Sequence, residues 1–351
     1  MKKNGLLSNI LTIAKTVAPA VVTKQVYDKM FSHHFYSYLP LTFSMQDFPN
    51  LNRTRYTFMS YSKKCLVGYI YRDGDLPVKG IFLFAHGYGN GGHINYLDLI
   101  NSICKHGYAV FAYDATAYDE SEGRTMKGFT QGMLDADRAI SFIESLDIYK
   151  KMPLYLAGHS WGAYSVSTAL GNHPRVKGLI AFSGFNSATT IFKENGEQYA
   201  GEKADEFMVY VDTYEKLLFG DICETTAVDS FKKSKAKIVI VHSQDDTTVP
   251  ISAGFNIYKK AFKKDKRFKF IHLLVNGHGT VYYTLPGKAY HDNIQNGFKK
   301  YMKKQKPNEI QKVEFLNTAI DRRKYLSMVD EKLITKCINF VVKTKSKKYV
   351  Y

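Results

Sequence analysis

The strongest chemical signal in the sequence is a serine between two glycines. In Gly158-His159-Ser160-Trp161-Gly162, the serine follows the apolar run Leu154 to Ala157 and precedes a helical stretch. A tight strand-to-helix turn needs small residues two positions before and after the serine, because a Cβ there would clash with neighbouring backbone. A Gly-x-Ser-x-Gly alone also fits an ordinary glycine-rich turn, but this placement favours a nucleophile. We therefore predict that Ser160 is a catalytic nucleophile.

A serine hydroxyl is a weak nucleophile until a base takes its proton and a carboxylate orients that base. Two adjacent carboxylates, Asp245 and Asp246, follow the apolar run Ile238 to Val241. The next apolar run is followed by Asn276-Gly277-His278-Gly279, a loop from which the histidine can reach across to a serine. Ser160, His278 and one of the aspartates could therefore form a triad, although either aspartate could also simply cap a turn.

The elements that would position these residues alternate between short apolar runs and helical patterns. An early hairpin is predicted at Arg55 to Tyr61 and Leu66 to Tyr71. The apolar runs after it are Ile81 to Ala85, Ala109 to Tyr113, Leu154 to Ala157, Leu179 to Phe182, Ile238 to Val241 and Phe268 to Leu274. Helical patterns lie between the first runs, at Tyr96 to Cys104, Met133 to Ile148 and Tyr164 to Leu170. The alternation predicts an α/β fold, with a mostly parallel sheet covered by helices on both faces.

Four ordered motifs together resemble the α/β-hydrolase superfamily, most closely its bacterial branch of serine aminopeptidases, monoacylglycerol lipases and lysophospholipases. They are His86-Gly87-Tyr88-Gly89, the serine segment, the Asp246 stretch and the His278 loop. The resemblance spans roughly Phe58 to Lys300 plus the final helix. It implies the α/β-hydrolase fold. It also favours Asp246 over Asp245 as the acid, because the family's acid begins an Asp-x-x-Val-Pro stretch.

The resemblance further implies an oxyanion hole made by the backbone N–H groups of Tyr88 and Trp161. The glycines after His86 could also suggest phosphate binding, but the loop lacks a Walker lysine and precedes a complete triad. One family segment departs from its pattern. After Asp114, the stretch Ala115-Thr116-Ala117-Tyr118-Asp119 replaces the usual glycines, which leaves the local turn in question.

Several other histidines are alternative bases. The resemblance implies packing or hydrogen-bonding roles for His159 and His242. His272 lies in an apolar run, so we expect it in the core, and we expect His93 and His291 at the surface.

The first 50 residues are predicted to be an N-terminal amphipathic helical segment. A basic start and Ala18-Pro19-Ala20 are typical of a signal sequence, but Lys15 interrupts the apolar stretch, and apolar residues recur at helical spacing as far as Phe31. A packed helix, a membrane-surface helix and a signal sequence all remain open. Residues 51–351 would form the hydrolase domain, with an inserted helical cap at 185–227, a second insertion at 280–325 before a final helix (Met328 to Val342), and a basic tail at 343–351.

The formal net charge of +17 is typical of proteins that bind nucleic acids or anionic membranes. More than half of this excess falls in residues 299–351, and no nucleic-acid motif accompanies it, so we expect a lysine-rich solvated surface and no nucleic-acid partner. Peripheral membrane contact through the N-terminal helix and the basic tail stays open. The four cysteines stand too far apart to indicate a metal cage or a disulfide framework.

Together these patterns predict a serine hydrolase that works through an acyl-enzyme without a metal or organic cofactor. The substrate would be a small-molecule carboxylic ester such as a monoacylglycerol or a lysophospholipid, because the cap is rich in aromatic residues (Phe185, Phe192, Tyr199 and Phe207), although these could equally pack the cap itself. An aminopeptidase-like serine peptidase, a thioesterase or acyltransferase, and a non-catalytic membrane-docking protein are the alternatives. The favoured location is cytoplasmic, with membrane association ahead of a cleaved signal or an anchor.

Overall fold

The structure is a computed structural model that describes residues 20–75, 77–200 and 204–343, without the side chains of 197–200, 204 and 206. The start of the predicted N-terminal helix and most of the basic tail lie outside the described residues. No helix in these parts of the chain is long and apolar enough to cross a membrane.

Eight strands form one sheet in the order β1-β2-β4-β3-β5-β6-β7-β8. The first two strands form the predicted antiparallel hairpin, β2 also pairs antiparallel with β4, and all other neighbours are parallel. This confirms the predicted mostly parallel α/β fold. The strands are β1 (Leu51–Met59), β2 (Cys65–Asp73), β3 (Ile81–Ala85), β4 (Ala109–Tyr113), β5 (Leu154–His159), β6 (Val176–Phe182), β7 (Lys237–Ser243) and β8 (Phe268–Leu273).

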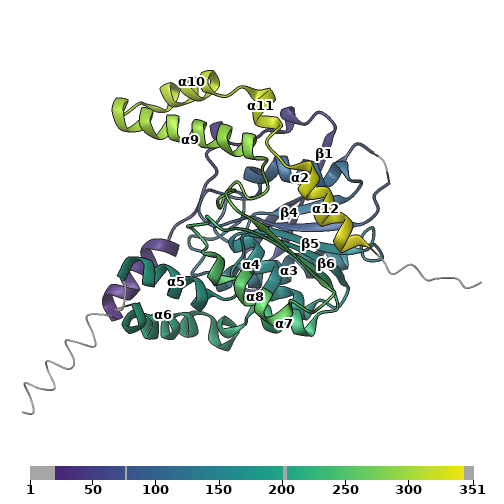
Figure 1. Ribbon diagram of the computed structural model, residues 1–351, viewed down its shortest axis with the longest axis vertical. Helices are drawn as coiled ribbons and strands as arrows, with labels where there is room; N and C mark the ends of the chain where they lie inside the picture. The colour runs from purple at the N-terminus through teal and green to yellow at the C-terminus, as the bar shows by residue number, and fades with distance from the viewer. Residues whose placement is uncertain (1–19, 76, 201–203, 344–351) are drawn as a thin grey trace, which may run out of the picture.

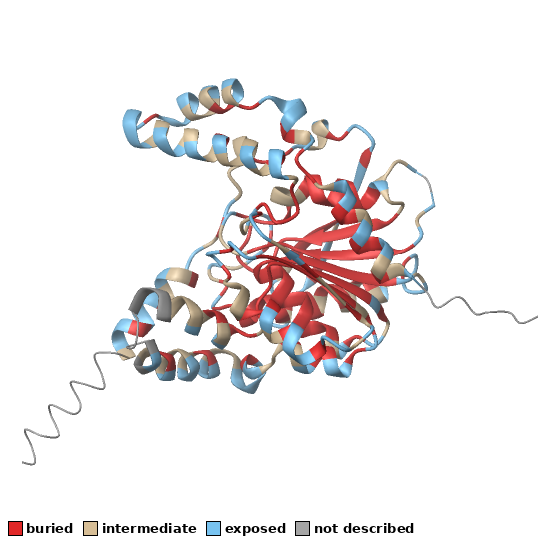
Figure 2. Cartoon of the chain, in the orientation of Figure 1, coloured by how far each residue is buried: buried red, intermediate tan, exposed pale blue. Residues whose placement is uncertain are grey.

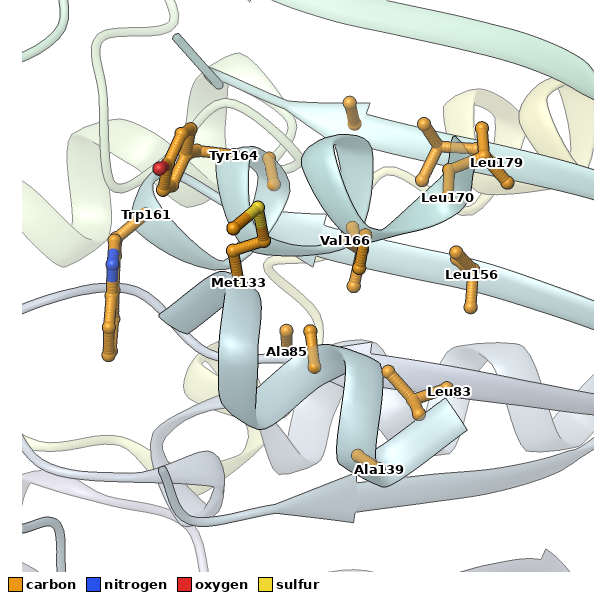
Figure 3. Packing of buried hydrophobic residues seen from close by; sticks show 14 of the residues in the cluster. Leu83, Ala85, Met133, Ala139, Leu156, Trp161, Tyr164, Val166, Leu170 and Leu179 are labelled. Atoms are coloured by element: carbon orange, nitrogen blue, oxygen red, sulfur yellow. The ribbon is translucent and has the colours of Figure 1, made fainter. Parts of the chain in front are cut away.

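Helices cover both faces of the sheet, as the alternating pattern predicted (Figure 1). One face is packed by α3 (Thr130–Ser145), α4 (Trp161–Ala169), α7 (Ala227–Lys233) and α8 (Phe255–Phe262). The other face is packed by α2 (Leu97–Lys105) and α12 (Glu331–Val342). The central strand β3 is buried on both faces, because Leu83 contributes to the first core cluster whereas Phe82 and Phe84 contribute to the second. Figure 3 shows side chains of α3 and α4 packed against the strands.

Two helical insertions extend beyond the sheet. One contains α5 (Ala188–Ala200), α6 (Ala204–Phe219) and the 3-10 turn η6 (Gly220–Glu224). The other contains α9 (Leu285–Gln305), α10 (Glu309–Ala319) and α11 (Arg322–Leu326). Figure 1 shows the pair α5 and α6 on one side of the molecule and the pair α9 and α10 on the other. The outer surfaces of these two helix pairs are exposed, whereas the central strands of the sheet, which have helices on both faces, are buried (Figure 2).

The N-terminal segment packs on the domain rather than standing apart from it. A helix over residues 20–31 lies against α6, where Tyr27 donates a hydrogen bond to the buried carboxylate of Glu215 and Tyr214 donates one to Asp28. The segment continues through the short turns η1 (Leu39–Leu41) and η2 (Met45–Asp47) into β1. For residues 20–50, the structure therefore shows a packed segment.

Candidate active site

Ser160 stands in the turn between β5 and α4, with φ 57° and ψ −122°. L-residues rarely adopt this conformation, and the strain is of the order of 1 kcal/mol or more. The flanking glycines make the turn possible. A Cβ on Gly158 would lie 2.6 Å from the backbone of Gly162, and one on Gly162 would lie 2.0 Å from the carbonyl oxygen of Ala85. Both glycines are therefore required for the close approach of β5, α4 and β3, and Ser160 is held at the carboxyl end of the central strands.

The structure brings the three predicted triad residues within hydrogen-bond distance. The Nε2 atom of His278 lies 2.9 Å from Ser160 Oγ, and its Nδ1 atom lies 2.8 Å from Asp246 Oδ2. Because the carboxylate can only accept, Nδ1 carries the proton and Nε2 is free to accept the hydroxyl proton of Ser160. The arrangement can therefore activate the serine for attack on an electrophilic carbon.

Asp246 is buried and held as an anion. Burial raises its pKa, but hydrogen bonds from His242 and His278 outweigh burial and hold the pKa of this carboxyl well below its usual range. Its Oδ1 atom accepts the backbone N–H groups of Thr248 and Val249, at 3.0 and 2.9 Å. The turn thus fixes the carboxylate before it contacts the base.

The neighbouring Asp245 is exposed and makes different contacts. Its Oδ1 atom accepts the hydroxyl of Ser243 at 2.6 Å and the backbone N–H of Gly277 at 2.8 Å. Asp245 thus braces the loop that carries His278 without touching the imidazole.

The two backbone donors predicted for an oxyanion hole flank the serine. The N–H groups of Tyr88 and Trp161 have no acceptor among the described residues, and Tyr88 and Ser160 line the same cleft. The side chains of both residues are fixed: Trp161 Nε1 donates to the carbonyl of Phe129 at 2.8 Å, and the Tyr88 hydroxyl donates to that of Met30 at 2.7 Å. Both amides can therefore receive a developing oxyanion without rearrangement of their side chains.

A chain of hydrogen bonds ties the oxyanion loop to the loop of the base. Gly87 N–H donates to the hydroxyl of Tyr96 at 3.0 Å, and this hydroxyl lies 2.9 Å from Nδ1 of His159. The Nε2 atom of His159 lies 3.0 Å from the carbonyl oxygen of His278. Burial, followed by the neighbouring His278, lowers the pKa of His159 to about 3, so this imidazole is neutral. Its single proton must sit on Nε2, because a carbonyl only accepts, and the direction of every bond in the chain is therefore fixed.

Removing the middle hydroxyl tests this connection. Tyr96→Phe leaves Gly87 N–H without its acceptor and His159 Nδ1 without its donor, so we expect kcat to fall about tenfold, the equivalent of one net hydrogen bond, with KM nearly unchanged. Steady-state kinetics on an activated ester would measure both constants. Tyr108→Phe, which removes a hydroxyl without a hydrogen bond among the described residues, is the control. A wild-type kcat in Tyr96→Phe would show that the chain does not position the loops.

Two of the expectations for the other histidines are wrong. His93 is buried, not at the surface: its Nδ1 atom lies 2.6 Å from Asp114, and its Nε2 atom lies 2.8 Å from the hydroxyl of Tyr71. His272 is exposed, not in the core: it lies on β8, the edge strand of the sheet, with its ring centre 5.5 Å from that of Phe255 and its Nε2 atom 2.9 Å from the side-chain oxygen of Gln244. His242 is buried and bonds the carbonyl of Val249 at 2.9 Å, whereas His291 is partly buried at the cleft.

The segment Ala115 to Asp119, where the family's usual glycines are replaced, still contains two residues with positive φ. Ala117 and Asp119 have φ values of 65° and 36°. An aspartate tolerates this region better than most residues. Its carboxylate also gains partners there: Oδ1 accepts Ser37 N–H at 2.6 Å, and Oδ2 accepts the Ser37 hydroxyl at 2.6 Å and Gly92 N–H at 2.8 Å. Asp119 thus fastens the N-terminal segment to the loop that carries Tyr88.

Loss of this carboxylate is expected to destabilise the protein. Asp119→Ala removes three hydrogen bonds to a charged acceptor, so we expect the free energy of unfolding to fall by about 2 kcal/mol. Asp119→Asn retains one acceptor oxygen and should lose less. Urea titration followed by circular dichroism would measure the difference, and equal midpoints for Asp119→Ala and wild type would contradict the expectation.

A cleft of about 560 Å³ opens above Ser160 and His278. Its walls come from the N-terminal segment (Tyr36 to Phe43), the loop Gly87 to Gly91, and α9 with its preceding residues. Two of these walls could not be predicted from the sequence, since no local pattern indicates that residues near 36 and 295 line the same cleft as the serine.

Among the described side chains, no aromatic residue of the cap, Phe185 included, lines this cleft, and neither does any other described residue of α5 or α6. Phe185 and Phe192 instead pack on Phe129, with ring centres 5.5 and 5.2 Å away, and Phe31 packs on the same ring at 5.0 Å. Phe207 is partly buried, and the side chain of Tyr199 lies outside the described residues. For Phe185 and Phe192, packing of the cap is therefore the observed role.

Comparison with known protein families gives a match over part of the chain. A model of the serine aminopeptidase family S33 matches residues 77–200, a range that runs from just before β3 to the end of α5. No match was found among the curated proteins.

Solved structures share the fold at low sequence identity. An esterase from Pyrococcus furiosus superposes with a TM-score of 0.54 and 16% identity, covering 74% of this chain and 95% of the esterase. An acylaminoacyl peptidase from Pyrococcus horikoshii gives a TM-score of 0.52 and 15% identity, covering 77% of this chain and 45% of the peptidase. An alpha/beta hydrolase from Penicillium sp. sh18 gives a TM-score of 0.50 and 13% identity, covering 76% of this chain and 99% of that one. Identities this low establish a common fold and leave the substrate open.

Proposed function

We propose that this chain is a serine hydrolase of the α/β-hydrolase superfamily that cleaves carboxylic esters through Ser160, His278 and Asp246. The partial match to a serine aminopeptidase model and the fold shared with an esterase support this proposal. The observation that carries the proposal is the continuous line of hydrogen bonds from Asp246 through His278 to Ser160, which is open to a cleft. Beside it are two backbone N–H groups that have no acceptor in the described part of the chain. Each part matches a separate requirement of acyl transfer.

The first half of the reaction forms an acyl-enzyme. Ser160 Oγ attacks the ester carbonyl carbon while its proton passes to His278 Nε2, and the carbonyl oxygen becomes an oxyanion held by the N–H groups of Tyr88 and Trp161. Asp246 stabilises the imidazolium that forms. When the tetrahedral intermediate collapses, the C–O bond to the alcohol breaks and His278 returns the proton to the departing oxygen.

The second half releases the acid. A water molecule attacks the acyl-enzyme carbonyl carbon as His278 Nε2 accepts one of its protons, and the oxyanion forms again in the same place. Collapse breaks the bond to Ser160 Oγ, which regains the proton from His278. The net reaction is ester plus water to acid plus alcohol.

Labelling with a fluorophosphonate, followed by a panel of acyl donors, tests the proposal. We expect modification of Ser160, located by mass spectrometry of the labelled peptide, and turnover of p-nitrophenyl acetate. An aminoacyl p-nitroanilide and an acyl thioester, assayed on the same enzyme, cover the peptidase and thioesterase alternatives. A folded protein that is neither labelled nor active on any of the three would refute a hydrolase.

A further inference from the structure

The wall of the cleft formed by α9 and the loop after β3 carries neutral polar groups that lack protein partners. The side-chain amides of Gln295 and Asn296 line the cleft from α9, and that of Asn90 lines it from the loop. None of the three amides has a hydrogen-bond partner among the described residues. An amide offers both donors and an acceptor, which is the combination that a hydroxyl group requires.

The carboxylate on the same wall already has a cationic partner. Asp292 is the single carboxylate among the described residues that line the cleft, and its Oδ2 atom lies 2.6 Å from Nζ of Lys288. Burial lowers the pKa of His291, so the imidazole beside Asp292 is neutral. Asp292 is therefore not free to bind the α-ammonium group of a peptide, and the exposed Lys299 stands at the far end of the wall.

The part of the cleft that comes from the N-terminal segment carries an exposed aromatic ring. The side chain of Tyr36 lines the cleft, is 72% exposed and stacks on His34 with ring centres 4.4 Å apart. An exposed, rigid ring offers apolar contact area at a low cost in conformational entropy. The C–H face of a sugar ring can pack on such an aromatic surface. The hydroxyl groups at the edge of the sugar could then form hydrogen bonds with the amides of α9.

From these observations we infer that the cleft binds the polyhydroxylated alcohol of the substrate, so that the enzyme removes short acyl groups from sugars. This inference rests on the proposed ester hydrolysis and deepens it. The acyl group is short because the aromatic rings beside the cap, which could have lined a long acyl tunnel, pack on Phe129 and on one another.

Three acetyl esters that differ in the alcohol alone test the inference: 6-O-acetylglucose, hexyl acetate and p-nitrophenyl acetate. We expect kcat/KM for acetylglucose to exceed that for hexyl acetate at least tenfold. Gln295→Leu and Asn296→Leu should each lower the ratio of kcat/KM for acetylglucose to that for p-nitrophenyl acetate about tenfold, the equivalent of one hydrogen bond. Asn293→Leu is the matched control, because Asn293 is an exposed amide on the same helix outside the cleft, and its ratio should be that of wild type.

The outcomes separate this inference from the proposed function. If Ser160 is labelled and p-nitrophenyl acetate is hydrolysed, but hexyl acetate is the better substrate, the sugar inference is overturned and the esterase stands. The same holds if the two α9 variants keep the wild-type ratio. Faster cleavage of the aminoacyl p-nitroanilide than of acetylglucose overturns it in favour of a peptide. If there is neither labelling nor hydrolysis, the proposed function and the inference fall together.

Discussion

Ser160→Ala is expected to lower ester turnover by about four orders of magnitude or more, because the attacking oxygen is lost and with it the covalent route. The oxyanion donors and His278 would remain, so hydrolysis by a bound water sets the residual rate. The fold should persist, because within the described residues the hydroxyl has no hydrogen-bond partner other than the imidazole, and alanine accepts the same backbone strain as serine. Turnover of p-nitrophenyl acetate and the thermal midpoint would be measured on the same preparation.

Ser165→Ala is the control for this prediction. Ser165→Ala removes a buried hydroxyl one turn further along α4, where it donates to the carbonyl of Trp161 at 2.7 Å, and should retain most of the activity. Equal loss of turnover in both variants would point to damage of the helix. A folded Ser160→Ala protein with wild-type turnover would show that Ser160 is not the nucleophile.

Asp246→Asn is expected to lower kcat by about four orders of magnitude with a smaller change in KM. An asparagine is nearly isosteric, but its NH2 group cannot accept the hydrogen bond that His278 Nδ1–H donates, and the imidazole no longer has an anion to stabilise its charged form. Steady-state kinetics between pH 6 and pH 9 would measure the loss.

Asp245→Asn is the matched control for this prediction. Its side chain would still present an oxygen to Gly277 N–H, and it does not contact His278, so we expect less than a tenfold change in kcat. The reverse pattern, with Asp245→Asn inactive and Asp246→Asn active, would mean that the acid has been assigned to the wrong aspartate.

The central elements could be predicted from the sequence because their signals are local. The apolar runs at Ile81 to Ala85 and Ala109 to Tyr113 are β3 and β4 to the residue. These strands are buried on both faces, so an unbroken apolar run marks their length. The serine turn could be predicted because it needs glycines at fixed positions, and the structure brings Ser160, Asp246 and His278 together, although their roles remain predictions.

Tertiary contacts explain what the sequence did not indicate. Nothing near His93 in the chain shows that Asp114 and Tyr71 surround it, and His272 lies in an apolar run at the edge of the sheet. The cap aromatics suggested an acyl pocket, yet the cleft is built from the N-terminal segment and α9. These contacts join residues that are far apart in the sequence.

The N-terminal segment has a consequence for the order in which the protein can assemble during synthesis. Its residues are made before the rest of the domain, but Phe35 pairs with Tyr118, and Tyr27 bonds to Glu215, 188 positions further along. The first-made segment must therefore wait, unpaired, until most of the chain exists. Such long loop closures slow folding. The packing of this segment, which contributes one wall of the cleft, therefore cannot be complete before residue 215 has been made.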